Sequence, residues 1–152
     1  VNHEGNTQKS EEEAEAIAQL VKVLLKGQCV QKDGTTKEIS LKDMLFVAPY
    51  NAQVALLQKK LGADAKVGSV DKFQGQQAPI VFFSMCASDA NEISRGMEFL
   101  YNMNRINVAI SRAQSMAIVV GNPALFCPTV NSIEQMKLVN LVSRLSIYSD
   151  IK

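Results

Sequence analysis

Histidine is nearly absent from this sequence, since His3 is the only one among 152 residues. Imidazole is the usual general base of hydrolytic triads and the commonest metal ligand in proteins. We expect His3 to lie outside the folded region, which leaves no Ser-His-Asp arrangement and no multi-histidine metal site. The three cysteines, Cys29, Cys86 and Cys127, are odd in number and include no CxxC pair. They argue against a disulfide framework or a zinc site and favour a reducing cytoplasm.

An excess of charge of either sign is also missing, because 16 basic and 15 acidic residues leave a formal net charge of +1. No overall basic field therefore indicates a nucleic-acid partner, and contacts with a polyanion must come from a local cluster. The apolar runs are too short to span a bilayer and no signal peptide pattern is present, so we expect no membrane partner. Val1 is not an initiator methionine, which favours a fragment of a longer protein.

Two phosphate-binding motifs are missing as well. No GxxxxGK[ST] occurs, so the chain has no P-loop (Walker A) of its own to cradle a triphosphate. No GxGxxG follows a predicted strand, which argues against a Rossmann dinucleotide site. No pair of carboxylates lies beside the end of a predicted strand, so we expect no two-metal chemistry and no metal ligand in this chain.

Helical and strand patterns alternate along the chain. Ser10 as N-cap and Glu13 three residues later form a capping box, which predicts a helix that ends at Gly27. Its apolar stripe comprises Ile17, Leu20, Val21 and Leu24. Residues 30–43 are polar and predict an exposed hairpin or loop. Further helices are expected over residues 52–61, 104–114 and about 132–146, buried strands over 44–50, 66–70, 78–84 and 116–120, and a polar loop over 86–101.

This alternation predicts an α/β fold of three layers, with a mainly parallel sheet and helices on both of its faces, as a single domain over residues 1–152. In such sheets, ligands collect at the carboxyl ends of the strands. The polar stretches "APYNAQ" and "SVDKFQGQ" directly follow predicted strands. We therefore expect both stretches at that rim of the sheet.

Arg105 and Arg112 are seven residues apart on the helix predicted over 104–114. Seven residues are two turns, so both side chains should share one flank beside the core-facing stripe. That stripe comprises Ile106, Ala109, Ile110 and Ala113. A guanidinium is permanently charged and presents a planar fork suited to phosphate oxygens, although the spacing alone fits two solvated arginines equally well. The turn at 71–77 offers Gly75 and several amides, which could read phosphate, ribose or base edges or could simply connect two strands.

Two of these stretches together resemble known motifs. "VGSVDKFQGQQ" and "NRINVAISRAQ", separated by an apolar strand, are similar to motifs V and VI of superfamily 1 helicases, in the branch of the Upf-type RNA helicases and the Dna/NAM-type DNA helicases. "VAPYNAQ" resembles the motif IV region of that branch, and "GNTQKSEEEAEAI" resembles the segment just upstream. The terminal "TVNSIEQMKLVNLVSRL" is similar to the tail of bacterial members, some of which carry a RecB-type nuclease module. The resemblance covers about residues 1–146, with the motifs in family order.

The resemblance implies the second, C-terminal RecA-like domain of a motor of the P-loop-NTPase type. Its first partner would be the N-terminal RecA-like domain of the same polypeptide, which in the family carries the Walker A and B motifs. ATP and Mg²⁺ would be bound mainly by that first domain, and single-stranded DNA or RNA would be the second partner. We therefore expect a cytoplasmic protein whose isolated second domain is catalytically inactive and binds no cofactor tightly.

The family's functional residues carry over onto matching positions. Arg112 matches the motif VI arginine that reaches the γ-phosphate, which makes it the catalytic candidate. The nucleotide-binding candidates match the earlier motif VI arginine and motif V; they are Arg105, Gln74, Gly75 and Gln77. The nucleic-acid-binding candidates match positions towards the bound strand or at the motif IV rim; they are Ser69, Asp71, Tyr50 and Asn51. Gln53 is expected at the same rim, although Tyr50 could instead pack under the loop.

Two departures from the family leave alternatives open. Gln77 stands where most members have Glu, which removes a negative charge from the nucleotide site, and Glu11 stands where some members have Arg. One alternative is a stand-alone module that binds nucleic acid or a protein without ATP. Another is a degenerate motor domain kept as a scaffold for an attached nuclease, which Gln77 supports and which the preserved Arg112 argues against.

Overall fold

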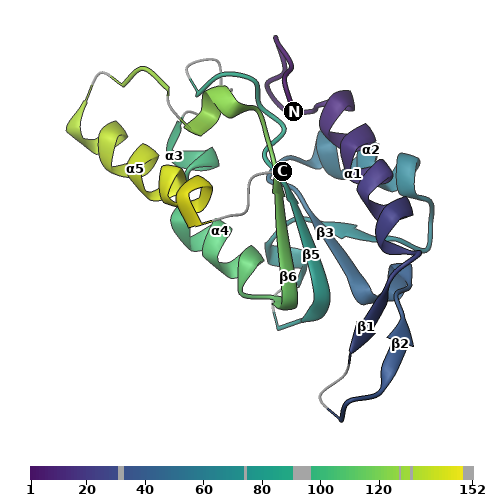
Figure 1. The fold of residues 1–152 in the computed structure, drawn as a ribbon. Helices are drawn as coiled ribbons and strands as arrows, with labels where there is room; N and C mark the ends of the chain where they lie inside the picture. Colours follow the sequence, from purple (N-terminus) through teal and green to yellow (C-terminus); the bar gives the residue numbers. More distant parts are fainter. Residues whose placement is uncertain (31–32, 74, 91–96, 127, 131, 149–152) are drawn as a thin grey trace.

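A computed structural model describes residues 1–30, 33–73, 75–90, 97–126, 128–130 and 132–148 of the chain. Its four-stranded sheet is parallel and has the strand order β4-β3-β5-β6. The strands are β3 (Met44–Val47), β4 (Lys66–Gly68), β5 (Ala78–Ser84) and β6 (Ala113–Val120). Helices α1 (Glu11–Leu24) and α2 (Asn51–Leu61) cover one face, and α3 (Met97–Leu100), α4 (Met103–Ile110) and α5 (Ile133–Tyr148) cover the other (Figure 1). The predicted α/β fold is therefore confirmed.

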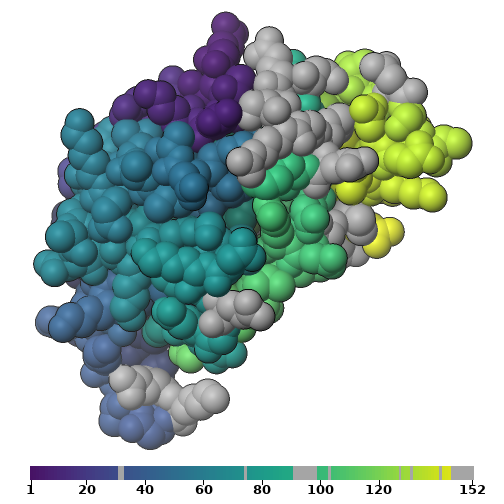
Figure 2. Space-filling model, turned by 180° about the vertical axis from the view of Figure 1, so that it is seen from behind, coloured from purple at the N-terminus to yellow at the C-terminus, as the bar shows by residue number. Residues whose placement is uncertain are grey.

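A small hairpin extends beyond the sheet. Its strands β1 (Gln28–Val30) and β2 (Thr36–Glu38) pair antiparallel, as the polar stretch around them predicts. Figures 1 and 2 show that the hairpin projects from one end of the body. Gly34 in the turn has a φ of 82°, a left-handed conformation that glycine adopts at little cost.

The short 3₁₀ helix η1 (Leu41–Asp43) follows the hairpin and is fixed by the carboxylate of Asp43. Lys37 Nζ donates to Asp43 Oδ1 at 2.8 Å, and the backbone N and Oγ of Ser40 donate to Oδ2 at 2.9 and 2.7 Å. The hydrogen bond from Lys37, followed by the one from Ser40, lowers the pKa of Asp43 from 3.8 to about 2. This carboxylate therefore stabilises the fold at any pH at which it is ionised.

Replacing Asp43 by asparagine should lower the free energy of unfolding by about 1–2 kcal/mol at neutral pH, a range that allows for the half-exposed Lys37. Because the folded-state pKa is depressed, the contribution is complete above the ordinary pKa and is lost as the pH falls through about 2. The difference between Asp43→Asn and wild type should thus shrink between about pH 4 and pH 2 in urea titrations. The exposed Asp64→Asn is the control, and a pH-independent difference would contradict the assignment.

Helix α1 begins as predicted but differs in two details. Ser10 is the N-cap, and its Oγ accepts a hydrogen bond from the Glu13 backbone N at 3.0 Å. The second bond of the predicted capping box, from the Ser10 backbone N to the Glu13 side chain, is absent from the described part of the chain. The Ser10 backbone N donates instead to Gln53 Oε1 at 2.8 Å. Leu20 is also predicted wrongly as a core residue, since it is 39% exposed. The helix instead buries the face formed by Ala14, Ile17, Ala18 and Val21, where two small alanines allow a close approach to the sheet.

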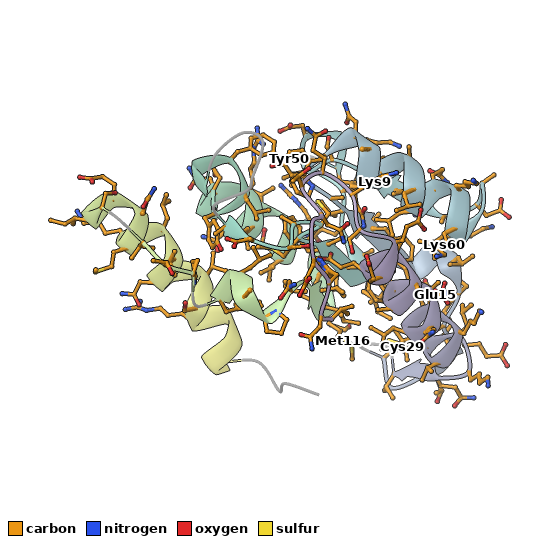
Figure 3. The ribbon with its side chains drawn as sticks, turned by 90° about the horizontal axis from the view of Figure 1, so that it is seen from above. Lys9, Glu15, Cys29, Tyr50, Lys60 and Met116 are labelled. Carbon is orange, nitrogen blue, oxygen red and sulfur yellow. The ribbon has the colours of Figure 1, made fainter. Side chains whose placement is uncertain are left out.

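Helices α1 and α2 lie side by side on the same face of the sheet. Lys60 of α2 contacts Glu15 and Glu11 of α1, with Nζ to carboxylate distances of 3.0 and 3.6 Å. Figure 3 shows Lys60 and Glu15 next to each other at the surface. Such an exposed ion pair stabilises a fold only weakly, so the packing of the two helices depends on the apolar side chains beneath them.

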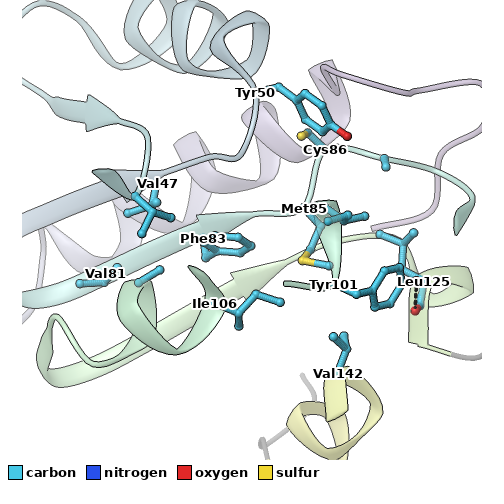
Figure 4. Close-up of a cluster of buried hydrophobic side chains, with 14 of the residues drawn as sticks. Val47, Tyr50, Val81, Phe83, Met85, Cys86, Tyr101, Ile106, Leu125 and Val142 are labelled. Carbon is cyan, nitrogen blue, oxygen red and sulfur yellow. Dashed lines mark hydrogen bonds between the residues drawn. The ribbon is translucent and has the colours of Figure 1, made fainter. Parts of the chain in front are cut away.

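The sheet is buried on both faces, which explains the continuous apolar runs in its strands. Alternate residues of β3 face opposite sides, so Phe46 stacks on Phe82 beneath α1 and α2 with ring centroids 5.1 Å apart. The other face of the sheet packs against α4 and α5, and the cluster between them includes Val47, Val81, Phe83 and Met85 on the sheet side and Ile106 and Val142 on the helices (Figure 4). Val142 belongs to the predicted stripe of the terminal helix, which spans Ile133–Tyr148.

Two boundaries in the second half of the chain differ from the sequence prediction. The loop expected over 86–101 contains the short helix α3, while its residues 91–96 lie outside the described part. The helix expected over 104–114 ends at Ile110, and β6 already begins at Ala113 rather than Met116. Ala113 is therefore a strand residue and does not continue the helical stripe. Within the described residues, no helix has the length and apolar character needed to cross a membrane.

Candidate functional site

The polar stretch of residues 69–77 crosses one face of the sheet. Strands β4 and β5 both run parallel to β3, so the chain leaving the carboxyl end of β4 must return to the amino end of β5. The 3₁₀ helix η2 (Asp71–Phe73) lies within this return, and Val70 and Phe73 join the cluster beneath α4. The prediction that the whole stretch lies at the carboxyl rim is therefore wrong beyond Ser69, because the parallel topology carries the chain back.

A shallow pocket of about 240 Å³ lies between this crossing segment and α4. Its lining residues come from both elements and from the turn that precedes β6; they are Val70, Asp71, Asn104, Arg105, Val108 and Arg112. On the face shown in Figure 2, the teal surface of the crossing segment borders the green surface of α4. Two guanidinium groups against one carboxylate give the pocket a local excess of positive charge, so it favours an anionic ligand.

Arg112 reaches this pocket from a turn and not from a helix. Its backbone N donates to Ala109 O at 3.2 Å, and its carbonyl accepts from Ala78 N at 3.1 Å. The prediction that Arg105 and Arg112 share a helical flank is thus wrong, because the pairing of Ala78 with the residues at 112–113 ends the helix. The prediction that they lie together is confirmed by the pocket that both residues line.

The side chain of Arg112 is incompletely satisfied in the described structure. The residue is half-buried, and its Nε has almost no exposed surface and no hydrogen-bond partner among the described residues. A buried donor without a partner costs about 1–3 kcal/mol, and more when the group is charged. Since this nitrogen is closed to solvent, an anion in the pocket would satisfy it only after the guanidinium turns outward.

Arg105 enters the pocket from the first turn of α4 and is held by an aromatic ring. Its guanidinium carbon lies 4.4 Å from the centroid of the Phe99 ring. The Phe99 ring in turn contacts Tyr50, with centroids 5.1 Å apart and planes inclined by 45°. The helix itself begins at the N-cap Asn102, whose Oδ1 accepts from the Arg105 backbone N at 3.2 Å.

The motif V residues lie where the crossing segment joins β5. Gly75 has a φ of 81°, which supports the prediction that glycine is needed for a tight backbone here. Gln77 is exposed and directly precedes Ala78, whose N–H binds the carbonyl of Arg112. Gln74, predicted beside them, lies outside the described residues. The backbone thus brings the predicted nucleotide-side residues 75 and 77 near Arg112.

The residues predicted to bind nucleic acid differ in their exposure to a ligand. Asp71 is exposed and lines the pocket, and Asn51 is exposed at the start of α2, while Ser69 is half-buried. Tyr50 is only 4% exposed and belongs to the hydrophobic cluster below α4. Figure 4 shows its ring above Cys86 at the end of the sheet. Its packing agrees with the alternative that it supports the loop from below.

Gln53 lies at the predicted rim of the sheet, beside Ser84 at the end of β5, but it is buried there and not exposed to a ligand. Its side chain is completely buried, and its Nε2 donates to Ser84 Oγ at 3.0 Å and to the Ser10 carbonyl at 3.2 Å. Its Oε1 accepts from the Ser10 backbone N. Gln53 therefore ties the start of α1 to the end of β5 and is not available to a ligand.

A buried polar cluster that sequence reasoning missed lies beside Gln53. The carboxylate of Glu13 accepts from Ser84 Oγ at 2.6 Å and from the Cys86 backbone N at 3.0 Å to each oxygen, and it contacts His3 Nε2 at 3.0 Å. His3 Nδ1 is hydrogen-bonded to Ser88 Oγ at 2.7 Å. The expectation that His3 lies outside the fold is therefore wrong.

In this cluster Ser88 contacts His3 and His3 contacts Glu13, which is the order of a catalytic triad. The three side chains are too deeply buried for a substrate to reach them. Ser88, His3 and Glu13 are 5%, 7% and 0% exposed. Burial, together with the Glu13 charge, raises the pKa of the Cys86 thiol, so Cys86 stays protonated and unreactive at neutral pH. The cluster instead fastens the N-terminal segment to the end of β5. The only signal for it in the sequence was the position of Glu13 in the segment upstream of motif IV.

No metal site is evident in the described part of the chain, where no group of three or more His, Cys, Asp or Glu side chains could hold an ion. The pocket at Arg105 and Arg112 therefore remains the candidate site. Its donors are guanidinium groups, which bind oxyanions and not cations.

Comparison with known proteins identifies helicases as relatives. The putative helicase mov-10-B.2 of Danio rerio is 37% identical over 99 residues, which cover 55% of this chain and 10% of that protein. The DNA polymerase alpha-associated DNA helicase A of Schizosaccharomyces pombe is 40% identical over 87 residues, which cover 55% of this chain and 13% of that protein. The RNA helicase Mov10l1 of Mus musculus is 34% identical over 102 residues, which cover 62% of this chain and 9% of that protein.

The chain thus spans about a tenth of the length of these relatives. The names of the three relatives agree with the helicase motifs in the sequence. The sequence profile of the AAA domain family matches residues 1–124, which include β1 to β6 and the whole pocket. This match shows that the chain belongs to the AAA domain family.

Proposed function

We propose that this chain is the second, C-terminal RecA-like motor domain of an ATP-dependent superfamily 1 helicase, with Arg112 as its arginine finger. The observation that carries the proposal is the buried Nε of Arg112, which has no partner among the described residues although its side chain lines a positively charged pocket. Membership of the AAA domain family and the helicase names of the relatives support the class of function.

The pocket residues fit the phosphate groups of ATP. Arg105 and Arg112 present only N–H donors, and their planar forks match the spacing of phosphate oxygens. Bound ATP with Mg²⁺ would supply the phosphoryl group whose transfer to water drives the motor, and the first domain of the polypeptide would hold most of it. Arg112 places a fixed positive charge where negative charge develops on that group. Gly75, Gln77 and Gln74 remain predicted neighbours of the nucleotide.

The backbone contacts of Arg112 offer a route from the nucleotide to the rest of the domain. Its carbonyl is bound by the first residue of β5, and its N–H is bound to the last turn of α4. In this proposal ATP lies in a cleft between the two domains, and a shift of Arg112 when that cleft closes or opens would move the crossing segment that carries Asp71. We propose that Ser69, Asp71 and Asn51 contact single-stranded DNA or RNA. A cytoplasmic location and a RecB-type nuclease in the same polypeptide are further parts of the proposal.

The isolated chain of 152 residues should hydrolyse no ATP above background, because the P-loop that holds the phosphates is not in its sequence. The longer protein that contains it should hydrolyse ATP, and single-stranded nucleic acid should stimulate the rate. Release of inorganic phosphate measures both. Robust turnover by the isolated chain would refute the proposal, and so would a lack of turnover by the longer protein with DNA or RNA present. Tight binding of single-stranded nucleic acid that does not depend on nucleotide would favour the alternative of a binding module that needs no ATP.

A further inference from the structure

Phe99 contacts both Tyr50 of the predicted motif IV region and Arg105 of the pocket. We propose that Phe99 is a positioning residue, whose ring holds the Arg105 guanidinium so that it meets the phosphate groups of a nucleoside triphosphate. This inference rests on the proposed function of the pocket. The contacts of Phe99 with Arg105 and with Tyr50 carry it.

The contact between Phe99 and Arg105 has the geometry of a cation–π interaction. The guanidinium carbon is 4.4 Å from the ring centroid, well inside the limit of about 6 Å for such contacts. By contrast, Lys72 Nζ lies 5.8 Å from the Phe73 ring, near that limit. An arginine side chain has several rotatable bonds, so a ring that stacks on its guanidinium selects a narrow range of orientations.

The Phe99 ring is itself supported from behind. Tyr50, directly before α2, contacts the ring at 5.1 Å and is 4% exposed, so it cannot move easily. The two residues that follow Phe99, Leu100 and Tyr101, are almost completely buried, and Tyr101 Oη donates to the Leu125 carbonyl. Figure 4 shows Tyr101 beside Leu125. The short helix α3 is therefore anchored at its end, and Phe99 is held between a buried ring and a charged group.

Loss of the ring should weaken the attraction of the pocket for phosphate. Asp71 lines the same pocket, and a guanidinium released from Phe99 would be drawn towards that carboxylate or into solvent. Either movement reduces the positive charge presented to an anion. Arg112 would be affected less, because its backbone is fixed by Ala78 and Ala109.

The test uses the longer protein and steady-state ATP hydrolysis. Phe99→Leu should raise KM for ATP by about 3- to 10-fold, with kcat changed by less than about 2-fold, as expected for a lost cation–π contact that acts on binding. Phe99→Tyr keeps the ring and should have the KM of the wild type. Phe99→Met is a second ringless variant with similar bulk in case leucine disturbs folding. Phe126→Leu, a half-buried phenylalanine outside the pocket, is the matched control and should leave KM unchanged.

A double-mutant cycle separates positioning from general packing. Arg105→Gln alone should raise KM, and Phe99→Leu added to Arg105→Gln should raise it no further, because the ring then has no guanidinium to hold. Equal effects of Phe99→Leu in both backgrounds, or an unchanged KM in Phe99→Leu while Arg105→Gln raises it, would overturn the inference and leave the proposed function standing. If Arg105→Gln and Arg112→Ala both leave ATP hydrolysis unchanged, the proposed function itself fails.

Discussion

Replacing Arg112 by alanine should lower kcat for ATP hydrolysis of the longer protein by about 10³-fold or more, the effect usually seen when an arginine finger is removed. The change removes a fixed cation that our proposal places against the transferring phosphoryl group. KM for ATP should change much less, because an interaction that forms mainly in the transition state contributes little to ground-state binding. Phosphate release under saturating ATP and single-stranded nucleic acid is the measurement.

Two variants make this experiment specific. Arg112→Lys keeps the charge but loses the planar fork, so it should recover only part of the rate. Arg144→Ala removes an exposed arginine of α5 outside the pocket and should leave kcat unchanged. A kcat of Arg112→Ala within about 2-fold of wild type would exclude the residue from the finger role, because a finger contributes orders of magnitude more.

Arg112→Ala should also leave the fold intact. The backbone bonds of Arg112 with Ala78 and Ala109 do not need its side chain, and the deletion removes a buried Nε that has no partner among the described residues. We therefore expect a free energy of unfolding within about 0.5 kcal/mol of wild type. A replacement that changes stability little but lowers activity strongly is typical of a residue in a functional site.

The α/β fold could be predicted because its signals are local. Continuous apolar runs such as Met44–Val47 and Ala78–Ser84 occur where both faces of a strand are covered, and they alternate with helical patterns. The start of β6 could not be predicted in the same way. Residues 111–115 fit a helix locally, but the Arg112 carbonyl accepts a hydrogen bond from Ala78 N, and β6 begins at the next residue, Ala113. That bond joins residues 34 positions apart in the sequence, so no short window contains its signal.

The path of the polar crossing segment was missed for a related reason. The prediction for residues 69–77 rests on the strand that they follow and leaves out that a parallel sheet carries the chain back to the start of the next strand. Since β4 and β5 are parallel and β3 lies between them, the segment must cross the sheet. This crossing, and not a shared helical flank, brings Asp71 to the arginines. The prediction that Arg105 and Arg112 lie together was therefore correct, although the helical flank on which it was based does not exist.

The buried polar cluster shows the limit of reading residue types alone. A single histidine near the chain start and a glutamate after a serine have ordinary local explanations, and Gln53 is the last residue of a stretch predicted at the rim of the sheet. Their partners Ser84, Cys86 and Ser88 come from another part of the chain. Because a buried polar group must be paired within the fold, the burial of these side chains means that they stabilise the structure and do not bind a ligand.

Glu13 is the centre of that cluster, and its removal should have the largest effect on stability. Its carboxylate accepts hydrogen bonds from Ser84 Oγ and from the Cys86 backbone N, and it contacts His3 Nε2. The Glu13→Ala variant would leave these groups buried without an acceptor, so the free energy of unfolding should fall by about 3–5 kcal/mol. Urea titration of the 152-residue chain at neutral pH measures the loss.

Glu13→Gln tests whether the loss comes from the missing acceptors or from an empty space. Glutamine fills the same volume, but its NH₂ group would face donors such as Ser84 or the Cys86 N–H, so the variant should still lose more than about 2 kcal/mol. Glu15→Gln is the matched control: Glu15 lies on the same helix and pairs with Lys60 at the surface, so its replacement should leave the free energy of unfolding nearly unchanged. If Glu13→Gln were as harmless as Glu15→Gln, the carboxylate would not hold the N-terminal segment against β5, and the rim of the sheet beside Tyr50 would need another support.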